Sequence, residues 1–179
     1  MGGWFIAHSG VKGMHWGVRN GPPYPIRQGI AGARSVMNDV GKISYKEFDR
    51  LQSIEQTKKT KRGSCHDQVW LECNELRRRG YDPKVKFLIE VDPNGRGGAT
   101  HSFAYFNSDD GKVNWIENAW GGNKGIHGYD SYDHMMADVK SRWERNDKYP
   151  ELLTGNLDYS KFNAGMDLGD IIDLVELDD

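Results

Sequence analysis

The clearest hydrophobic pattern in the chain lies between residues 64 and 80, where apolar positions recur every three or four residues. This spacing places Cys65, Val69, Cys73 and Leu76 on one face of a helix. Ser64 is a typical N-cap, and Asp67 stands at the capping-box position. Three arginines followed by Gly80 are typical of a helix end. We therefore expect a helix that begins at Cys65 and ends before Gly80.

After Gly80 the period of the pattern changes to two, which is typical of strands. Residues 85–91 (VKFLIEV) are predicted to form a strand, and the Pro, Asn and Gly residues that follow predict a loop. Residues 100–106 and 113–120 are predicted to form two further strands. The residues between them, NSDDGK, have the composition of a hairpin turn.

The remaining segments have less regular patterns. We expect two short helices between residues 30 and 56, the second beginning at Ser44 with Glu47 at its capping-box position, and then a charged connector over 57–62. Another helix is expected from about residue 131, and an acidic helix or mixed structure at 166–179. The order predicts an α+β domain over residues 31–179, with helices packed on a small antiparallel sheet, preceded by a largely irregular segment over 1–30.

Composition narrows the classes of function. The 179 residues include 24 Lys and Arg and 26 Asp and Glu, a formal net charge of −2, which gives no reason to expect nucleic acid or an anionic membrane as a partner. No run approaches the ~20 apolar residues of a membrane span, and no signal peptide is recognisable. Two cysteines without CxxC or paired Cys/His spacing predict neither a disulfide framework nor a metal site, and we expect no cofactor.

Cys65 is the first candidate for chemistry. The nucleophilic form of cysteine is the thiolate, and the positive end of a helix dipole stabilises it. Cys73 lies on the same face in mid-helix, without free backbone donors, and is expected to be a core residue.

A cysteine nucleophile also needs a base and a group that orients it, and the predicted hairpin supplies both. A three-residue loop, Asp109 to Gly111, would place Phe103 opposite Glu117. His101 and Glu117 would then be diagonal neighbours on one face, within reach of each other's side chains. A two-residue loop would separate them and leave Asn118 as the orienting group.

The segments GSCHDQVW, THSFAYF, NWIENAW and GIHGY together resemble the transglutaminase-like, papain-like cysteine hydrolases. The resemblance spans about residues 62–132 and implies the papain-like fold, with Cys65 as nucleophile, His101 as base and Glu117 as the residue that holds the imidazole. It also implies an oxyanion site at the helix start and a protein or peptide substrate. Candidate oxyanion or substrate residues are Ser64, His66, Asn118 and Trp120. His66 departs from the pattern, because many relatives have an aromatic residue there.

The N-terminal segment carries a second resemblance. HSGVKGMHWGVRNGPPYP, residues 8–25, is similar to an HxGxKGxxWGVR motif found in proteins of tailed bacteriophages and prophages. The resemblance implies a phage or prophage origin, and a location in the bacterial cytoplasm or the virion. Its apolar and glycine residues are suited to docking on a phage or host protein.

These features favour a cysteine enzyme that forms a thioester acyl-enzyme on an amide substrate. They do not separate a peptidase from a deamidase or a transglutaminase, because all three share that step. The alternative is a catalytically inactive module that binds a virion or host protein.

Overall fold

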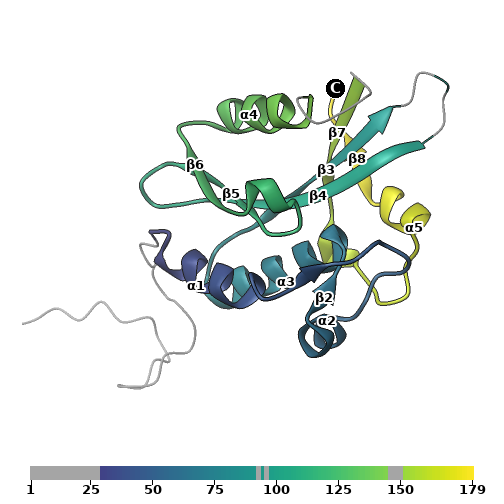
Figure 1. Ribbon diagram of the computed structural model, residues 1–179. Coiled ribbons are helices and arrows are strands. Elements are labelled where there is room, and N and C mark those ends of the chain that lie inside the picture. The colour runs from purple at the N-terminus through teal and green to yellow at the C-terminus, as the bar shows by residue number, and fades with distance from the viewer. Residues whose placement is uncertain (1–28, 92–93, 95–96, 145–150) are drawn as a thin grey trace, which may run out of the picture.

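The computed structural model describes residues 29–91, 94, 97–144 and 151–179, so the predicted N-terminal segment lies almost wholly outside the described residues (Figure 1). The described residues form six strands of one antiparallel sheet: β3 (Lys84–Val91), β4 (Gly97–Asn107), β5 (Val113–Glu117), β6 (Gly125–Tyr129), β7 (Glu151–Leu157) and β8 (Val175–Leu177). The strand order is β6-β5-β4-β3-β7-β8. Two short strands, β1 (Ser44–Tyr45) and β2 (Arg62–Gly63), pair separately and in parallel.

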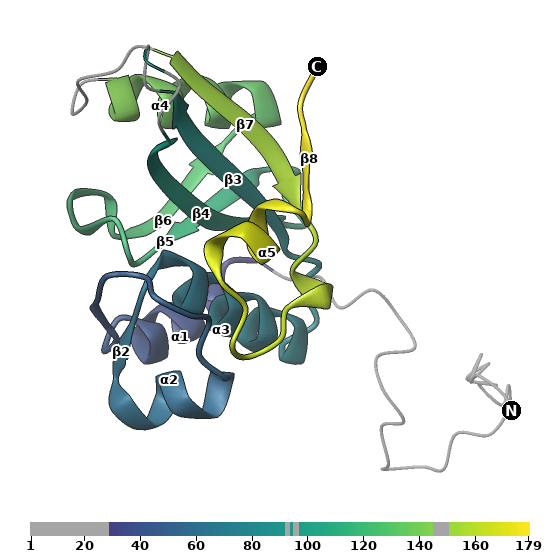
Figure 2. The ribbon, with the colours of Figure 1, turned by 90° about the vertical axis from the view of Figure 1, so that its right-hand side faces the viewer.

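Helices cover both faces of the sheet. One face carries α1 (Ala31–Val40), α2 (Ile54–Thr60) and α3 (Cys65–Arg78), and the other carries α4 (Tyr132–Glu144), as Figures 1 and 2 show. A short helix, α5 (Leu168–Ile172), lies beside the sheet near β8, and single 3-10 turns occur at Gly121–Asn123 and Tyr159–Lys161. The described part of the chain is therefore an α+β fold built around an antiparallel sheet, as expected.

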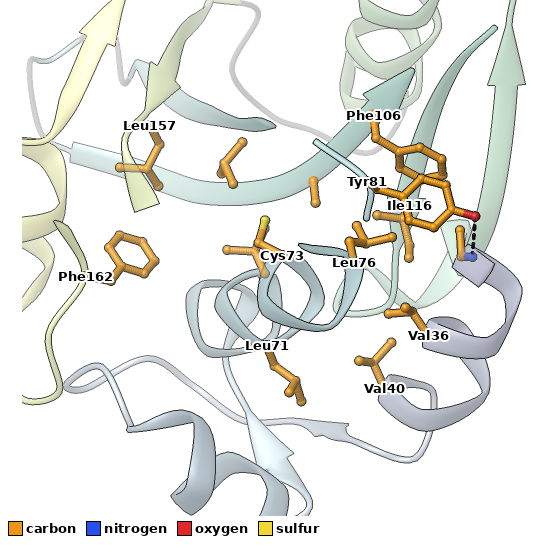
Figure 3. Close-up of a cluster of buried hydrophobic side chains, with 14 of the residues drawn as sticks. Val36, Val40, Leu71, Cys73, Leu76, Tyr81, Phe106, Ile116, Leu157 and Phe162 are labelled. Atoms are coloured by element: carbon orange, nitrogen blue, oxygen red, sulfur yellow. Dashed lines mark hydrogen bonds between the residues drawn. The ribbon is translucent and has the colours of Figure 1, made fainter. Parts of the chain in front are cut away.

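The alternation along β3 divides the core into two clusters. Val85 and Phe87 point to the α1 and α3 side, where they join the cluster drawn in Figure 3. Leu88 points to the opposite side and packs with Met135 and Val139 of α4. Each fully buried side chain of this size contributes about 1.5–3 kcal/mol through its removal from water. The two clusters therefore fix α3 and α4 on opposite faces of the same strands.

The predicted ends of α3 are confirmed. Ser64 caps the helix: its Oγ accepts a hydrogen bond from the Asp67 backbone N–H, and the Asp67 carboxylate accepts one from the Ser64 N–H. Gly80 follows the C-terminus with φ of 88°, the left-handed conformation that glycine adopts without strain. Cys73 lies within the core cluster, and Figure 3 shows its side chain on the opposite side of α3 from Leu71.

The predicted register of the hairpin is also confirmed. Asn107 pairs with Val113 and Ala104 with Ile116, and the Ser108 N–H donates to the Lys112 carbonyl across a three-residue loop. Gly111 has φ of 82° in that loop, as the turn requires.

The region before α3 differs from the prediction. Ser44 begins no helix; its N–H donates to the Lys61 carbonyl and it belongs to β1. The second helix is α2, capped by Ser53, whose Oγ accepts from the Gln56 N–H, so most of the expected connector is helical. The long-range pairing of β1 with β2 outweighs the local capping signal at Ser44. Strands β6, β7 and β8 were not predicted, and the expected mixed structure at the C-terminus consists of α5 and β8.

Among the helices of the described ranges, none combines the length and the apolar character that crossing a membrane requires.

Candidate active site

Three separate elements bring Cys65, His101 and Glu117 together, and we call these residues the triad. Cys65 is the first residue of α3, His101 lies on β4, and Glu117 is the last residue of β5. The hairpin register places His101 and Glu117 on the same face, because Ala104 opposite Ile116 makes Phe103 the neighbour of Glu117. Packing of α3 on the sheet brings its first turn to this position.

The imidazole of His101 is held by the carboxylate of Glu117. Nε2 of His101 donates to Oε2 of Glu117 over 2.7 Å, and both side chains are buried. The second carboxylate oxygen, Oε1, accepts the backbone N–H of Trp120 over 2.9 Å. Both oxygens of Glu117 are therefore engaged, and the imidazole ring is fixed in orientation. Its other nitrogen, Nδ1, is left for the sulfur.

The thiol of Cys65 interacts with the imidazole of His101, and this interaction acts on the pKa of both groups. Burial alone would raise the pKa of the Cys65 thiol, but the charge of His66 and the hydrogen bonds to His101 and His66 lower that pKa to about 5. Burial alone would lower the pKa of His101, but the Glu117 charge and the hydrogen bonds to Cys65 and Glu117 raise it to about 10. Between these values the stable state of the pair is a thiolate beside an imidazolium.

His66 is a second imidazole beside the same sulfur. Its ring is almost fully buried, stacks on Phe87 at a centroid distance of 5.4 Å, and meets Phe48 edge-on at 5.0 Å. Nδ1 of His66 lies 2.8 Å from the Ser102 hydroxyl, and the side chain is hydrogen-bonded to Cys65. The sequence marked His66 as an oxyanion or substrate candidate. Its burial instead makes it a positioning residue for the sulfur.

Two other candidates are committed to structural contacts. Ser64 is fully buried, and its hydroxyl donates to the Asp67 carboxylate over 2.8 Å, so it serves the helix cap and not a substrate. Asn118 turns away from His101: its side-chain amide donates to the carbonyls of Val40 and Ile43 and to Gln68 Oε1. Asn118 therefore ties α1 and α3 to the end of β5, and Glu117 alone orients the imidazole.

Glu72 is a buried acid close to the triad. It lies two turns after Cys65 on α3, and its Oε1 is buried without a hydrogen-bond partner. Burial raises the pKa of Glu72 well above its usual range, and the negative charge of Glu117 raises it further. The positive charge of His101 acts in the opposite direction and lowers the pKa of Glu72.

A cavity of about 250 Å³ opens onto His101. Its walls include the aromatic rings of Tyr45, Trp120 and Trp143. Trp120 meets the His101 ring edge-on at 5.7 Å, and Trp143 lies 6.2 Å from it. Of the four candidate oxyanion or substrate residues, Trp120 alone lines this cavity, where a substrate would reach the triad.

Sequence reasoning missed Tyr45 and Trp143 as parts of this site. Tyr45 was assigned to a helix, but the pairing of β1 with β2 places it next to the segment that leads into Cys65. Burial raises the pKa of the Tyr45 hydroxyl, and the charge of Cys65 raises it further. Trp143 belongs to the helix that was expected after residue 131, and only the packing of that helix against His101 reveals its place.

No cluster of three or more His, Cys, Asp or Glu side chains in the described part of the chain is arranged to hold a metal ion.

Comparison with known protein families gives a short match. The profile of a family of unknown function, DUF7211, matches residues 4–23, the segment that carries the HxGxKGxxWGVR motif. No curated protein matches the chain. The match covers a small part of the sequence and does not reach Cys65, His101 or Glu117.

Proposed function

We propose that this chain is a cysteine enzyme of the papain-like, transglutaminase-like kind, which forms a thioester acyl-enzyme on an amide substrate. One observation carries the proposal: a buried carboxylate holds the imidazole of His101, and this imidazole and a thiol at a helix start shift each other's pKa. This arrangement provides a nucleophile, a proton carrier and an orienting group.

The reaction begins with attack of the Cys65 thiolate on the amide carbonyl, which forms a C–S bond. The imidazolium of His101 then gives its proton to the leaving amine as the C–N bond breaks. Water or an acceptor amine attacks the resulting thioester, and neutral His101 takes the proton of that nucleophile. The C–S bond breaks and the thiolate and imidazolium are restored. Throughout the cycle Glu117 keeps the ring in place and stabilises its positive charge.

The oxyanion of the tetrahedral intermediate would be met at the N-terminus of α3. The first amides of a helix lack intrahelical partners, and the Cys65 N–H is the first of them. The positive end of the helix dipole acts in the same direction. A backbone donor of this kind is commonly worth about 2.7–4 kcal/mol in the transition state.

The phage or prophage origin rests on the resemblance of the N-terminal HxGxKGxxWGVR motif to a motif of phage and prophage proteins. On this proposal the enzyme works in the bacterial cytoplasm or is carried in the virion. The motif would bind a phage or host protein, while the triad acts on a protein or peptide substrate. Peptidase, deamidase and transglutaminase activities all fit, and they differ in the acceptor that attacks the thioester.

Acylation by p-nitrophenyl acetate tests this proposal without knowledge of the natural substrate. We expect a burst of nitrophenolate that matches the enzyme concentration, with an acetyl group on Cys65 that hydroxylamine removes. Cys65→Ala should abolish the burst, and Cys73→Ala should keep it. Added amines that speed turnover would indicate a transferase. If the wild-type protein gives no burst above the Cys65→Ala background, the chain is an inactive binding module.

A further inference from the structure

The cavity beside His101 has a composition that defines what it can accept. Besides His101 and the three aromatic rings, its walls are formed by small side chains, among them Thr100 and Ala119. None of the described residues that line it is Asp, Glu, Lys or Arg. A wall of this kind offers dispersion contact and apolar surface, and very little that would compensate a buried charge.

The charge of the triad also argues against an ionic occupant. His101 is an imidazolium at the cavity wall, so a lysine or arginine side chain would meet a like charge there. An acidic side chain would find no free cation, because His101 is already paired with Glu117 and with the Cys65 thiolate. An uncharged apolar group avoids both costs and gains from the three rings.

The size of the cavity points to one side chain. Its volume of about 250 Å³ lies below the ~300–1,000 Å³ typical of sites that enclose a whole small molecule. The position of the cavity, beside His101, indicates which substrate side chain would occupy it. His101 forms part of the wall and interacts with the Cys65 thiol, so a group seated in the cavity lies against the imidazole of the triad.

We propose that this cavity receives the apolar side chain of the substrate residue whose carbonyl Cys65 attacks, so that the enzyme selects amides that follow a large aliphatic or aromatic residue. This inference rests on the proposed function and adds the class of substrate. Tyr45, Trp120 and Trp143 are then residues that determine specificity.

Peptidyl chloromethyl ketones test the inference, because they alkylate an active-site thiolate and carry a chosen side chain next to the reacting carbon. The set consists of blocked Phe, Leu, Gly, Lys and Asp chloromethyl ketones, and each rate is divided by the rate with iodoacetamide, which has no side chain. We expect the Phe and Leu reagents to modify Cys65 at least ~10-fold faster than the Gly reagent. The Lys and Asp reagents should gain nothing over Gly.

Variants of the cavity wall make the test specific. Ala119→Leu adds volume inside the cavity and should bring the normalised Phe and Leu rates close to the Gly rate. Tyr45→Ala removes one ring at a half-exposed position and should reduce the same preference. Ala137→Leu makes the identical change at an exposed position on α4 and should leave every ratio unchanged. Thermal unfolding checks that each variant is folded.

The outcomes separate this inference from the proposed function. Fast iodoacetamide alkylation of Cys65 with equal normalised rates for all reagents overturns the substrate class and leaves the proposed function standing. A preference for the Lys reagent shows instead that the rings form a cage for a cation. If Cys65 reacts with iodoacetamide no faster than an ordinary thiol, the proposed function itself fails, and this inference fails with it.

Discussion

Cys65 and Cys73 lie on the same face of α3, yet the pKa values of their thiols are shifted in opposite directions. Both side chains are buried, and burial favours the neutral thiol in each. Around Cys73, which lies in the hydrophobic core, the charge of Glu72 adds to the effect of burial, and the charge of Arg77 opposes it without reversing it. Around Cys65 two imidazoles and the helix start reverse it. The low pKa of the Cys65 thiol therefore comes from the two imidazoles, because burial alone would raise it.

We expect His66 to be needed for the low pKa of the Cys65 thiol, because its charge and its hydrogen bond both lower that pKa. In His66→Phe, which keeps an aromatic ring against Phe87, we expect the thiol pKa to rise by about one unit or more. His66→Gln keeps a donor and should show a smaller rise. The pH dependence of iodoacetamide alkylation measures both. An unchanged midpoint in His66→Phe would show that His66 serves only packing.

Glu117 should act through its charge as well as through its hydrogen bonds. In Glu117→Gln the pKa of His101 should fall, because the charge that raises it most is gone. The imidazolium is then lost at a lower pH, and acylation by p-nitrophenyl acetate should slow by roughly 10²-fold or more at neutral pH. Glu176→Gln, an exposed site on β8, is the matched control. Equal acylation rates in the two variants would remove Glu117 from the mechanism.

At the scale of elements, the position of Cys65 depends on how α3 begins. The Asp67 carboxylate accepts from the Ser64 N–H and hydroxyl, and also from the Gln52 backbone N–H over 2.7 Å. One buried side chain thus fixes the first turn of α3 and the loop that precedes α2. Asp67, which the sequence predicts as part of a helix cap, therefore also forms a long-range contact with Gln52.

Replacing Asp67 should therefore cost more than an ordinary cap. We expect Asp67→Ala to lower the free energy of unfolding by about 2–3 kcal/mol, because several buried donors lose their acceptor. Urea unfolding measures the loss. Asp167→Ala, which removes the similar cap of the exposed helix α5, should cost about 1 kcal/mol or less and is the control. Similar losses in both variants would mean that the contact with Gln52 adds nothing.

The elements that sequence could predict are those specified by neighbours in the chain. The cap of α3 is local, and the three-residue loop fixes the register that joins His101 to Glu117. Tyr45 could not be placed, since its strand exists only through pairing with residues after α2. Spacing alone left Asn118 as an alternative to Glu117. The structure shows that the Asn118 amide instead donates to carbonyls at the end of α1 and in the loop that follows it.

At the scale of the whole molecule, the sheet carries a buried charge outside the triad. Lys86 is almost fully buried on the α4 side of β3, and its Nζ donates to Asp178 and to Asn156. The carboxylate of Asp178 also accepts the Thr154 hydroxyl. Residues of β3, β7 and the end of the described chain are joined by this one ammonium group, which no local pattern in the sequence reveals.

Asp178→Asn should destabilise the fold by about 2 kcal/mol at neutral pH, since it removes the carboxylate that pairs with the buried Lys86 side chain. Burial raises the pKa of Asp178, but the hydrogen bonds to Lys86 and Thr154 lower it below its usual value of about 4. Its stabilisation is therefore complete above about pH 4 and is lost as pH falls through the lower, folded-state pKa. Unfolding at a series of pH values should show the difference between wild type and variant shrinking on acidification. A constant difference would contradict the ion pair.

Titration of the Cys65 thiol tests directly whether Cys65 and His101 form a thiolate–imidazolium pair. In a Cys73→Ala background the only thiol is Cys65, and its thiolate absorbs in the ultraviolet. We expect this absorbance to develop with a midpoint near pH 5, and we expect His101→Ala to move the midpoint upward. A midpoint at or above about 8.5, the value of an ordinary cysteine, in the protein with His101 intact would contradict the thiolate–imidazolium pair and the enzyme built on it.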